Sequence, residues 1–511
     1  MFLDKLKEEC GVFGVSLSSD DAVGVTYNGL LALQHRGQEG AGIAVVYDNR
    51  IAIRKDVGLV GEALSHKLAG MPRGRVAVGH NRYSTTGGNV KENVGPFLKE
   101  YLTGRIALSH NGNVTNASEV KEQLKSYGIT FRATTDSEVI ASLVAYFVSR
   151  EQEKLVITKG RTGNFKDVMH SRYKGGDELQ LKAIVGGIAK ACKLLEGAFC
   201  LVIATGCGKM IIVRDPQGFR PLIIGRNESG IAVASESCAL DSTGFKPERD
   251  VLPGEIVVVE SGQIVYEKIK LKAEGSSKRF GLCIFEYVYF SRGDSIVDNQ
   301  SVHRARVSMG KTLARENIEL DAKVKPDIVC GVPDSGLDAA YGYSLESGIP
   351  LVSGFVKNRY LGRSFIYPTQ SQRESIVRLK LNPVSMNVKG KSVILVDDSI
   401  VRGTTSKKIV RALKDAGAKE VHLRISSPPF LYTCHFGTDI DNEENLIANK
   451  VGLTSDLARN IKSEENKKAI QKIRDSVGAD TLAYISLEGL LYACRFSTRK
   501  FCTACFTGYG N

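Results

Sequence analysis

The segment at residues 393–405, VILVDDSIVRGTT, constrains the fold of this chain more than any other part of the sequence. A short apolar run leads there into two adjacent carboxylates, and a Gly-Thr-Thr sequence follows. Residues 406–416 then carry apolar side chains at helical spacing, and Gly417 follows as a stop. Further apolar runs lie at 327–332 and 421–425. Strand, helix and strand joined by short connections form a βαβ unit, so we expect a parallel sheet in the second half.

The polar loop inside this segment has the residues that a phosphate site needs. Backbone amides and Thr hydroxyls at a helix N-terminus can hold a phosphate dianion. Gly403 allows the backbone to approach the phosphate oxygens. Asp397 and Asp398, at the carboxyl edge of a parallel strand, suit ribose hydroxyls and Mg²⁺. An ordinary strand-to-helix turn with an Asp N-cap would explain the two Asp residues but not the whole string.

The same string resembles the signature of type I phosphoribosyltransferases, which bind 5-phosphoribosyl-1-pyrophosphate (PRPP). The resemblance implies that residues 399–405 hold the 5′-phosphate, while Asp397 and Asp398 hold the ribose hydroxyls. The residues expected to bind PRPP are Asp397, Asp398, Ser399, Arg402, Gly403, Thr404 and Thr405.

Two further segments fit this resemblance. Residues 331–335, GVPDS, look like the pyrophosphate loop of the family, and residues 360–378 look like its mobile lid. A lid excludes water, which would otherwise hydrolyse an activated ribosyl donor. Ser335 is then expected to join Asp397 and Asp398 as a ligand of Mg²⁺.

The first half carries a candidate nucleophile. Cys10 opens the string CGVFGV, where a Cys would ordinarily be buried filler. Four later strings argue for a catalytic role: QHRGQEG at 34–40, GHNRYST at 79–85, HNGN at 110–113 and TTDSE at 134–138. Together with Cys10 they resemble class II glutamine amidotransferases, which are N-terminal-nucleophile hydrolases.

The resemblance assigns roles to these residues. In that family the α-amino group of the nucleophilic Cys is the base, and its pKa of about 7.7–8.0 suits this task. The amine exists only if Cys10 is the first residue, so residues 1–9 are expected to be removed as a propeptide. Asn111 and the Gly112 amide are expected to form the oxyanion hole. The residues expected around glutamine are Arg36 near the Cys, Arg82 on the α-carboxylate and Asp136 on the α-ammonium group.

Joined in one chain, the two resemblances narrow to the glutamine phosphoribosylpyrophosphate amidotransferases. The implied reaction converts PRPP, glutamine and water into 5-phosphoribosylamine, glutamate and pyrophosphate, with ammonia passing internally. It is the first step of de novo purine synthesis. The implied fold is α+β and α/β: a four-layer αββα glutaminase domain, then a phosphoribosyltransferase domain with a mainly parallel sheet. Purine nucleotide effectors and a homotetramer or homodimer are also implied.

The expected domain boundaries follow from these strings. They are 1–9 for the propeptide, 10–250 for the amidotransferase domain, 251–282 for a hairpin and linker, 283–490 for the phosphoribosyltransferase domain and 491–511 for a C-terminal tail. Residues 154–177 are predicted to be a polar surface insertion, and 273–278 a linker. Strands are predicted in the first half at 12–17, 42–47, 75–79 and 105–109.

The 11 Cys residues need an explanation in a chain expected to be cytoplasmic. Cys502 and Cys505 form a C-x₂-C pair, which alone could bind zinc, carry redox chemistry or do nothing. Cys283 and Cys434 lie in strings that resemble the iron–sulfur branch of the family. The resemblance implies a [4Fe–4S] cluster on these four thiolates, with tetrahedral zinc as runner-up and Cys494 as a rival ligand. The Cys residues expected in the core are Cys192, Cys200, Cys207, Cys238 and Cys330.

Composition and charge exclude several other classes of protein. The chain has 69 Lys and Arg against 56 Asp and Glu, but no five consecutive residues are basic, so a small polyanion is favoured over nucleic acid. An apolar fraction of 42% excludes global disorder. No apolar run reaches the roughly 18 residues of a membrane span, and residues 1–9 lack the apolar region of a secretory signal. A cytoplasmic protein without a nucleic-acid or membrane partner is therefore expected.

Two alternatives to this function were weighed. Another class II amidotransferase, such as the one that makes glucosamine phosphate, would lack the phosphate loop. A non-catalytic PRPP- or nucleotide-sensing regulator would have a lost nucleophile and an appended DNA-binding helix pair. Cys10, Arg82, Asn111 and Asp136 are all present, which favours an enzyme.

Overall fold

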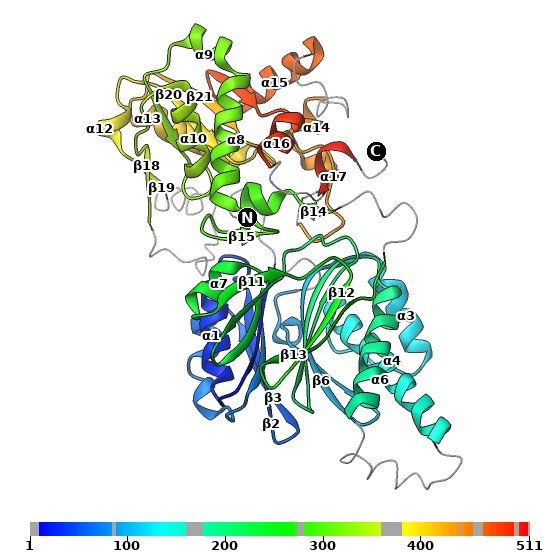
Figure 1. Ribbon diagram of the computed structural model, residues 1–511. Helices are drawn as coiled ribbons and strands as arrows, with labels where there is room; N and C mark the ends of the chain where they lie inside the picture. Colours follow the sequence, from blue (N-terminus) through cyan, green and yellow to red (C-terminus); the bar gives the residue numbers. More distant parts are fainter. Residues whose placement is uncertain are drawn as a thin grey trace. The chain divides into compact units, whose positions relative to one another are not determined.

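The computed structural model describes residues 10–83, 88–159, 177–272, 281–358, 381–438, 440, 442–452, 463–494 and 500–508. The chain divides into two compact units (Figure 1). The N-terminal unit comprises the described residues up to Leu282 together with His435–Gly437. The C-terminal unit comprises Cys283–Cys434 and the described residues from Thr438 onward. In the part of the chain covered by these ranges, no helix is both long enough and apolar enough to cross a membrane.

Two antiparallel sheets form the centre of the N-terminal unit. The seven-stranded sheet has the order β11 (Lys246–Asp250), β9 (Ile223–Asn227), β10 (Gly230–Ala234), β1 (Gly11–Leu17), β4 (Val76–Arg82), β2 (Gly40–Tyr47) and β3 (Arg50–Val57). The six-stranded sheet has the order β13 (Gln263–Ile269), β12 (Glu255–Glu260), β8 (Lys209–Arg214), β7 (Gly197–Thr205), β6 (Gly104–Val114) and β5 (Phe97–Tyr101).

Helices cover the outer face of each sheet (Figure 1). They are α1 (Ala22–Ala32), α2 (Val60–Leu64) and α7 (Ser237–Ser242) on the seven-stranded sheet, and α3 (Ala117–Ser126), α4 (Asp136–Lys159) and α6 (Asp177–Lys193) on the six-stranded sheet. Separate apolar clusters fill the three interfaces. Phe13 belongs to the cluster between the seven-stranded sheet and its helices, and Val12 and Val202 lie in the cluster between the two sheets. Leu108 and Ile140 belong to the cluster between the six-stranded sheet and its helices. The predicted four-layer αββα fold is therefore confirmed.

Strand β1, which directly follows Cys10, is held tightly between these layers. A Cβ atom on Gly14 would lie 2.5 Å from Val202 Cγ1 on the facing sheet. A Cβ atom on Gly29 of α1 would lie 2.5 Å from the ring of Phe13 on the opposite side. Real Cβ atoms do not approach other atoms so closely, so glycine is required at both crossings. The close packing fixes the strand from which Cys10 projects.

The C-terminal unit is built on a parallel sheet. Its order is β17 (Ile328–Gly331), β20 (Ser392–Asp397), β21 (Glu420–Ile425) and β22 (Thr481–Tyr484), and all three pairings are parallel. Its longer helices are α8 (Val302–Glu316), α9 (Ile318–Val324), α10 (Leu337–Ser347), α13 (Thr404–Asp415), α15 (Glu464–Val477) and α16 (Leu487–Ala493). Because β17 and β20 are parallel neighbours, the loops that follow them lie at the same edge of the sheet.

Short elements complete the C-terminal unit. They are β14 (Leu282–Cys283), which pairs with β23 (Phe501–Cys502), β15 (Ile296–Val297) with β16 (Gln300–Ser301), β18 (Phe355–Lys357) with β19 (Leu381–Pro383), and the helical turns η5 (Glu286–Phe290), α12 (Ser385–Val388), α14 (Ile447–Lys450) and α17 (Ala504–Thr507).

Most of the predicted elements match the structure. The strands predicted in both halves overlap the observed ones, and the helix predicted at 406–416 is α13, which begins two residues earlier. The prediction of a polar insertion starting at residue 154 was wrong at its beginning, because α4 continues to Lys159. The hairpin predicted within 251–282 consists of β12 and β13, which are part of the six-stranded sheet. Residues 1–9, 160–176, 273–278 and 360–378, which carry the predicted propeptide, most of the insertion, the linker and the lid, lie outside the described residues.

Two candidate active sites

Cys10 lies directly before β1, beside the end of β4. Its Sγ atom is 3.5 Å from the carbonyl oxygen of Tyr83 and 3.4 Å from the amide nitrogen of the same residue. Tyr83 follows β4, and Gly11 and Asn81 are paired in the two strands. The Cys10 side chain is partly exposed. A thiol in this position can be reached by a substrate at the end of the sheet.

The string QHRGQ follows α1 and brings Arg36 to Cys10. The Nε atom of Arg36 donates a hydrogen bond of 3.2 Å to the carbonyl oxygen of Cys10, and the guanidinium is buried. A Cβ atom on Gly37 would lie 2.6 Å from the carbonyl carbon of Asn81, so only glycine lets this loop pass β4. Asn81 itself donates a hydrogen bond of 2.7 Å to the carbonyl oxygen of Leu30.

Arg82 and Asp136 supply opposite charges near Cys10. Burial lowers the pKa of Arg82 below its usual value, while the negative groups of Cys10, Glu39 and Asp136 oppose that shift. Asp136 begins α4, and its Oδ2 atom accepts a 3.0 Å hydrogen bond from the amide of Val114. A guanidinium and a carboxylate placed in this way match the carboxylate and ammonium groups of an α-amino acid.

Asn111 and Gly112 lie on β6. The Asn111 side chain is fully buried, and within the described part of the chain neither its Nδ2 nor its Oδ1 atom has a hydrogen-bond partner. A buried amide without partners is rare in proteins and indicates either a ligand or a catalytic role. Gly112 has a φ of +141°, and a Cβ atom there would lie 2.1 Å from the carbonyl oxygen of Ala198, so glycine is required. The Asn111 amide can therefore donate to a developing oxyanion.

Two histidines near these residues are uncharged. Burial lowers the pKa of His80 to about 3, and it also lowers the pKa of His110, against the effect of Asp136. His110 Nδ1 lies 3.0 Å from the hydroxyl oxygen of Ser137. Both rings are therefore neutral near pH 7, and the charges at this site come from Arg82, Arg36 and the carboxylates.

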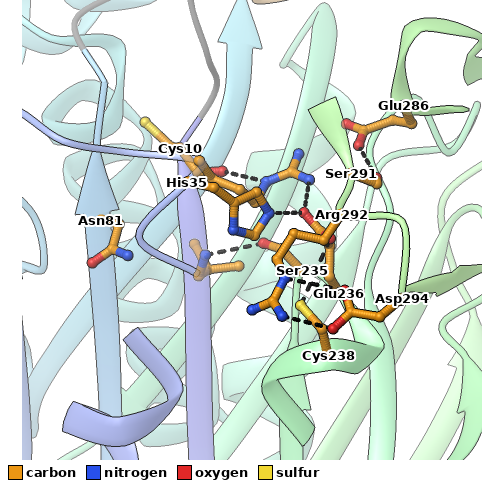
Figure 2. Close-up of polar contacts among 12 residues, drawn as sticks. Cys10, His35, Asn81, Ser235, Glu236, Cys238, Glu286, Ser291, Arg292 and Asp294 are labelled. Carbon is orange, nitrogen blue, oxygen red and sulfur yellow. Dashed lines mark hydrogen bonds and ion pairs between the residues drawn. The ribbon is translucent and has the colours of Figure 1, made fainter. Parts of the chain in front are cut away.

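Glu236 and His35 also belong to this site, although the sequence analysis assigned no role to either. Glu236 is fully buried, and its Oε1 atom accepts hydrogen bonds from Arg36 Nη1 at 2.6 Å and from His35 Nε2 at 2.7 Å (Figure 2). No local pattern indicates a partner about 200 residues away.

The second candidate site lies at the carboxyl edge of the parallel sheet. Asp397 is the last residue of β20, and Asp398 follows it; both side chains are buried. Asp398 accepts hydrogen bonds from the hydroxyls of Ser335 and Ser399. Ser335 comes from the loop after β17, so the structure brings the two predicted loops together. Carboxylate and hydroxyl oxygen atoms of this kind are the ligands that Mg²⁺ prefers.

The N-terminus of α13 completes this site. Gly403 is the N-cap and has a left-handed φ of +83°. Thr404 is exposed, Arg402 is half-buried, and Thr405 is buried with its Oγ1 atom unpartnered among the described residues. A helix N-terminus with an unsatisfied hydroxyl is suited to a phosphate group. Lys357, just before the predicted lid, forms an ion pair with Asp334 of the predicted pyrophosphate loop.

Four cysteines converge in the C-terminal unit. The Ile284 amide donates to the carbonyl oxygen of Cys502, and the Tyr432 amide donates to that of Cys505. The residue after Cys283 and the residue two positions before Cys434 therefore contact the C-x₂-C pair. Burial raises the pKa of Cys505 well above its usual range, and the neighbouring Cys283, Cys502 and Cys434 raise it further. Within the described ranges, no three His, Cys, Asp or Glu side chains come close enough for a single metal ion.

The other cysteines lie mostly in the core, as predicted. Burial raises the pKa of Cys192 and Cys330 to about 12, and Cys200 and Cys238 are buried as well. Cys207 is an exception, because it is partly exposed at the turn between β7 and β8. Cys494, the rival ligand, is buried after α16, and burial alone raises its pKa.

Comparisons with known proteins match both halves of the chain. A family model described as a glutamine amidotransferase domain matches residues 80–242, and one described as a phosphoribosyl transferase domain matches residues 299–426. The amidophosphoribosyltransferase of Archaeoglobus fulgidus is 42% identical over 501 residues, covering 98% of this chain and 97% of that protein. The amidophosphoribosyltransferase of Bacillus subtilis is 40% identical over 511 residues, covering 98% of this chain and 94% of the relative.

Two solved structures are similar over the whole chain. Glutamine PRPP amidotransferase from Bacillus subtilis, complexed with ADP and GMP, has a TM-score of 0.79 and 38% identity, covering 98% of this chain and 97% of that one. A structure described as the allosteric regulatory enzyme of purine biosynthesis has a TM-score of 0.79 and 39% identity, covering 98% and 96%.

Proposed function

This chain belongs to the amidophosphoribosyltransferases, which transfer the amide nitrogen of glutamine to PRPP in the first step of purine nucleotide synthesis, and we propose that its two units divide this reaction. The N-terminal unit releases ammonia from glutamine at Cys10. The C-terminal unit adds that ammonia to the ribose at Asp397 and Asp398. The observation that carries the proposal is the convergence of Arg36 and Arg82 on Cys10, from strings far apart in the sequence.

In the N-terminal unit, the Cys10 thiol attacks the side-chain amide carbon of glutamine. After removal of residues 1–9, the α-amine of Cys10 accepts the thiol proton and passes it to the leaving ammonia. The Asn111 amide and the Gly112 N–H stabilise the oxyanion, which the unpartnered Asn111 side chain supports. Water then hydrolyses the thioester and releases glutamate.

Arg82 and Asp136 hold the glutamine α-carboxylate and α-ammonium groups in this proposal. The negative field that Asp136 exerts on Arg82 supports their closeness. Arg36 fixes the carbonyl of Cys10.

In the C-terminal unit, residues 399–405 hold the 5′-phosphate of PRPP, and Asp397 and Asp398 hold its ribose hydroxyls. The helix N-terminus at Gly403 and the buried Thr405 hydroxyl support this assignment. Ser335, Asp397 and Asp398 would hold Mg²⁺, whose charge stabilises the departing pyrophosphate. Ammonia must reach the ribose unprotonated, because the ammonium ion has no lone pair, so an internal passage is part of the proposal.

Cys283, Cys434, Cys502 and Cys505 would hold a [4Fe–4S] cluster with a structural role. The effect of the other three thiols on the pKa of Cys505 supports a shared site. A single zinc ion needs four sulfur ligands at about 2.3 Å from the metal.

Regulation by purine nucleotides is also proposed, because the similar Bacillus subtilis enzyme was solved with ADP and GMP. The phosphate loop at 399–405 is a suitable place for a nucleotide phosphate, so an effector would compete with PRPP there. A homotetramer or homodimer and a cytoplasmic location stay predictions from the sequence.

One assay tests the division of labour. Cys10→Ala is expected to abolish pyrophosphate release from PRPP with glutamine, while release with added ammonia persists. If the unaltered protein released no pyrophosphate with either glutamine or ammonia, that result would instead support a non-catalytic sensor. Intact-protein mass spectrometry tests the propeptide separately, since Met1 retained on fully active enzyme would contradict an N-terminal Cys10.

A further inference from the structure

Glu236 lies at the start of α7, close to the N-terminus of β1 but far from it in sequence. Its carboxylate is fully buried, as is the guanidinium of Arg36 that it contacts at 2.6 Å. A buried ion pair of this kind is costly to desolvate, and removing one partner leaves the other charge uncompensated. The pair therefore fixes the position of the Arg36 guanidinium.

Arg36 transmits this constraint to the nucleophile. The same guanidinium that bonds to Glu236 through Nη1 donates through Nε to the carbonyl oxygen of Cys10 at 3.2 Å. His35, the preceding residue, bonds to the same Glu236 oxygen and holds the loop after α1 from a second point. Figure 2 shows Glu236 and His35 gathered beside Cys10.

Ser235, the residue before Glu236, forms two hydrogen bonds with the backbone of β1. The Ser235 hydroxyl accepts a 3.0 Å hydrogen bond from the amide of Val12, and the Ser235 amide donates 3.0 Å to the carbonyl oxygen of Val12. Residues 235 and 236 thus hold the beginning of β1 on both sides of Gly11. A nucleophile must be placed to within a fraction of an ångström for efficient attack.

We propose that Glu236 is a positioning residue for glutamine hydrolysis, which acts on Cys10 through Arg36. The inference rests on the proposed role of Cys10 as the nucleophile. It predicts that the charge of Glu236 matters for the turnover of bound glutamine and not for its binding, since none of these contacts involves Arg82 or Asp136, which are assigned to the α-groups of glutamine.

Glu236→Gln tests this, with Glu228→Gln as the matched control, because Glu228 is an exposed carboxylate in the turn at the other end of β10. For E236Q we expect the glutamine-dependent kcat to fall about tenfold or more. The KM for glutamine and the ammonia-dependent kcat are expected to stay within about twofold of the unaltered protein. E228Q is expected to match the unaltered protein in all three.

A double-mutant cycle tests the route through Arg36. Arg36→Gln combined with E236Q is expected to be no slower than Arg36→Gln alone, whereas fully additive losses would overturn the proposal. Glu236→Asp, which keeps the charge, is expected to recover part of the lost kcat. Equal loss of glutamine- and ammonia-dependent activity in both E236Q and E236D would also overturn it, because Glu236 would then be a folding residue.

The nucleophilic role of Cys10 and the positioning role of Glu236 are refuted by different results. Glutamine-dependent synthesis that survives in Cys10→Ala would refute the proposed nucleophile itself. An unimpaired E236Q beside an inactive Cys10→Ala would refute the role of Glu236 alone.

Discussion

Asn111 is a buried side chain whose proposed catalytic role would come at the expense of stability. A buried amide without hydrogen bonds destabilises the folded state by about 1–3 kcal/mol. For Asn111→Ala we expect a fall of about 10²- to 10³-fold in glutamine-dependent kcat, as for other oxyanion-hole donors. The rate of glutamate release measures this fall in kcat, and the ammonia-dependent reaction, which does not use Asn111, serves as the control.

The free energy of unfolding provides an independent check on Asn111. Since the substitution removes an unsatisfied polar group, the stability lost with the side chain's packing is partly offset. We therefore expect Asn111→Ala to be much less destabilising than its loss of activity suggests. A variant with full glutaminase activity would contradict the oxyanion role.

His80 makes the stability of the protein depend on pH. Its folded-state pKa of about 3 lies below the 6.5 of an exposed histidine, so below pH 6.5 the unfolded chain binds a proton that the folded chain does not. The stabilisation is complete above about pH 6.5 and declines as the pH falls towards 3, by up to about 1.4 kcal/mol per pH unit. For His80→Gln we expect a smaller decline between pH 6.5 and 5 in urea unfolding.

His66→Gln is the control for this prediction, because His66 is exposed. It is expected to keep the pH dependence of the unaltered protein. An unchanged pH dependence in His80→Gln would show that His80 is not held neutral. His110, whose pKa burial also lowers, accounts for part of the dependence that remains.

Single residues could be predicted where a string carried its own chemistry. The strings QHRGQ and GHNRYST correctly placed Arg36 and Arg82 near Cys10. Glu236 could not be found in this way, because a buried carboxylate is recognised only by its partners. Those partners, His35 and Arg36, come from a loop about 200 residues earlier.

At the scale of elements, the start of α13 allows a sharp test of the phosphate loop. Gly403 has a left-handed φ of +83°, and a Cβ atom would lie 2.5 Å from Ile447 Cδ1. Gly403→Ala is expected to lower kcat/KM for PRPP by about tenfold to a hundredfold, because the loop backbone must shift. Initial rates at varied PRPP concentration, with ammonia as the nitrogen source, measure this effect.

Gly390→Ala separates loop geometry from general strain. Gly390 has a similar φ of +72°, and an added Cβ atom would meet nothing within 4 Å. Both variants are expected to lose about 1 kcal/mol or more of stability. Only Gly403→Ala should lower kcat/KM for PRPP. Equal losses of kcat/KM in the two variants would argue against a phosphate site at α13.

Elements with strong periodicity could be predicted, and those stabilised by distant partners could not. The βαβ unit around α13 was clear because each part had its own apolar pattern. The end of α4 was missed because its support comes from another helix. The Glu151 carboxylate bonds to Lys154 on α4 and to Lys190 on α6. A contact across helices leaves no mark in the local sequence.

At the scale of the whole molecule, the compact units do not follow the order of the chain. Residues 435–437 belong to the N-terminal unit, although the residues on both sides belong to the C-terminal unit. There Phe436 stacks on Phe219, with ring centroids 4.2 Å apart, and its carbonyl oxygen accepts from Arg220. Asn113, next to Gly112, donates to the carbonyl oxygen of His435. The predicted boundaries assumed contiguous domains. No local sequence pattern at residues 435–437 predicts that they belong to the other unit.

The proposed iron–sulfur site also joins distant parts of the chain, since its ligands lie at residues 283, 434, 502 and 505. Burial raises the pKa of Cys505, and the three neighbouring thiols raise it further, because thiolates close together repel one another unless a cation balances them. A cluster would supply that cation and hold the C-terminal segment in place. Cys505→Ala is therefore expected to lose most of the iron and acid-labile sulfide from anaerobically purified protein.

Cys494→Ala is the matched control for Cys505→Ala, because Cys494 is a buried thiol in the same unit and was the rival ligand. Its pKa is raised by burial alone, without an effect of the other thiols, so its removal should leave iron and sulfide unchanged. Cys505→Ala should also unfold at lower temperature than Cys494→Ala, since metal binding contributes to folding. Equal loss of iron in both variants would restore Cys494 as a ligand. A colourless protein that contains zinc would show that the four thiolates hold zinc instead of an iron–sulfur cluster.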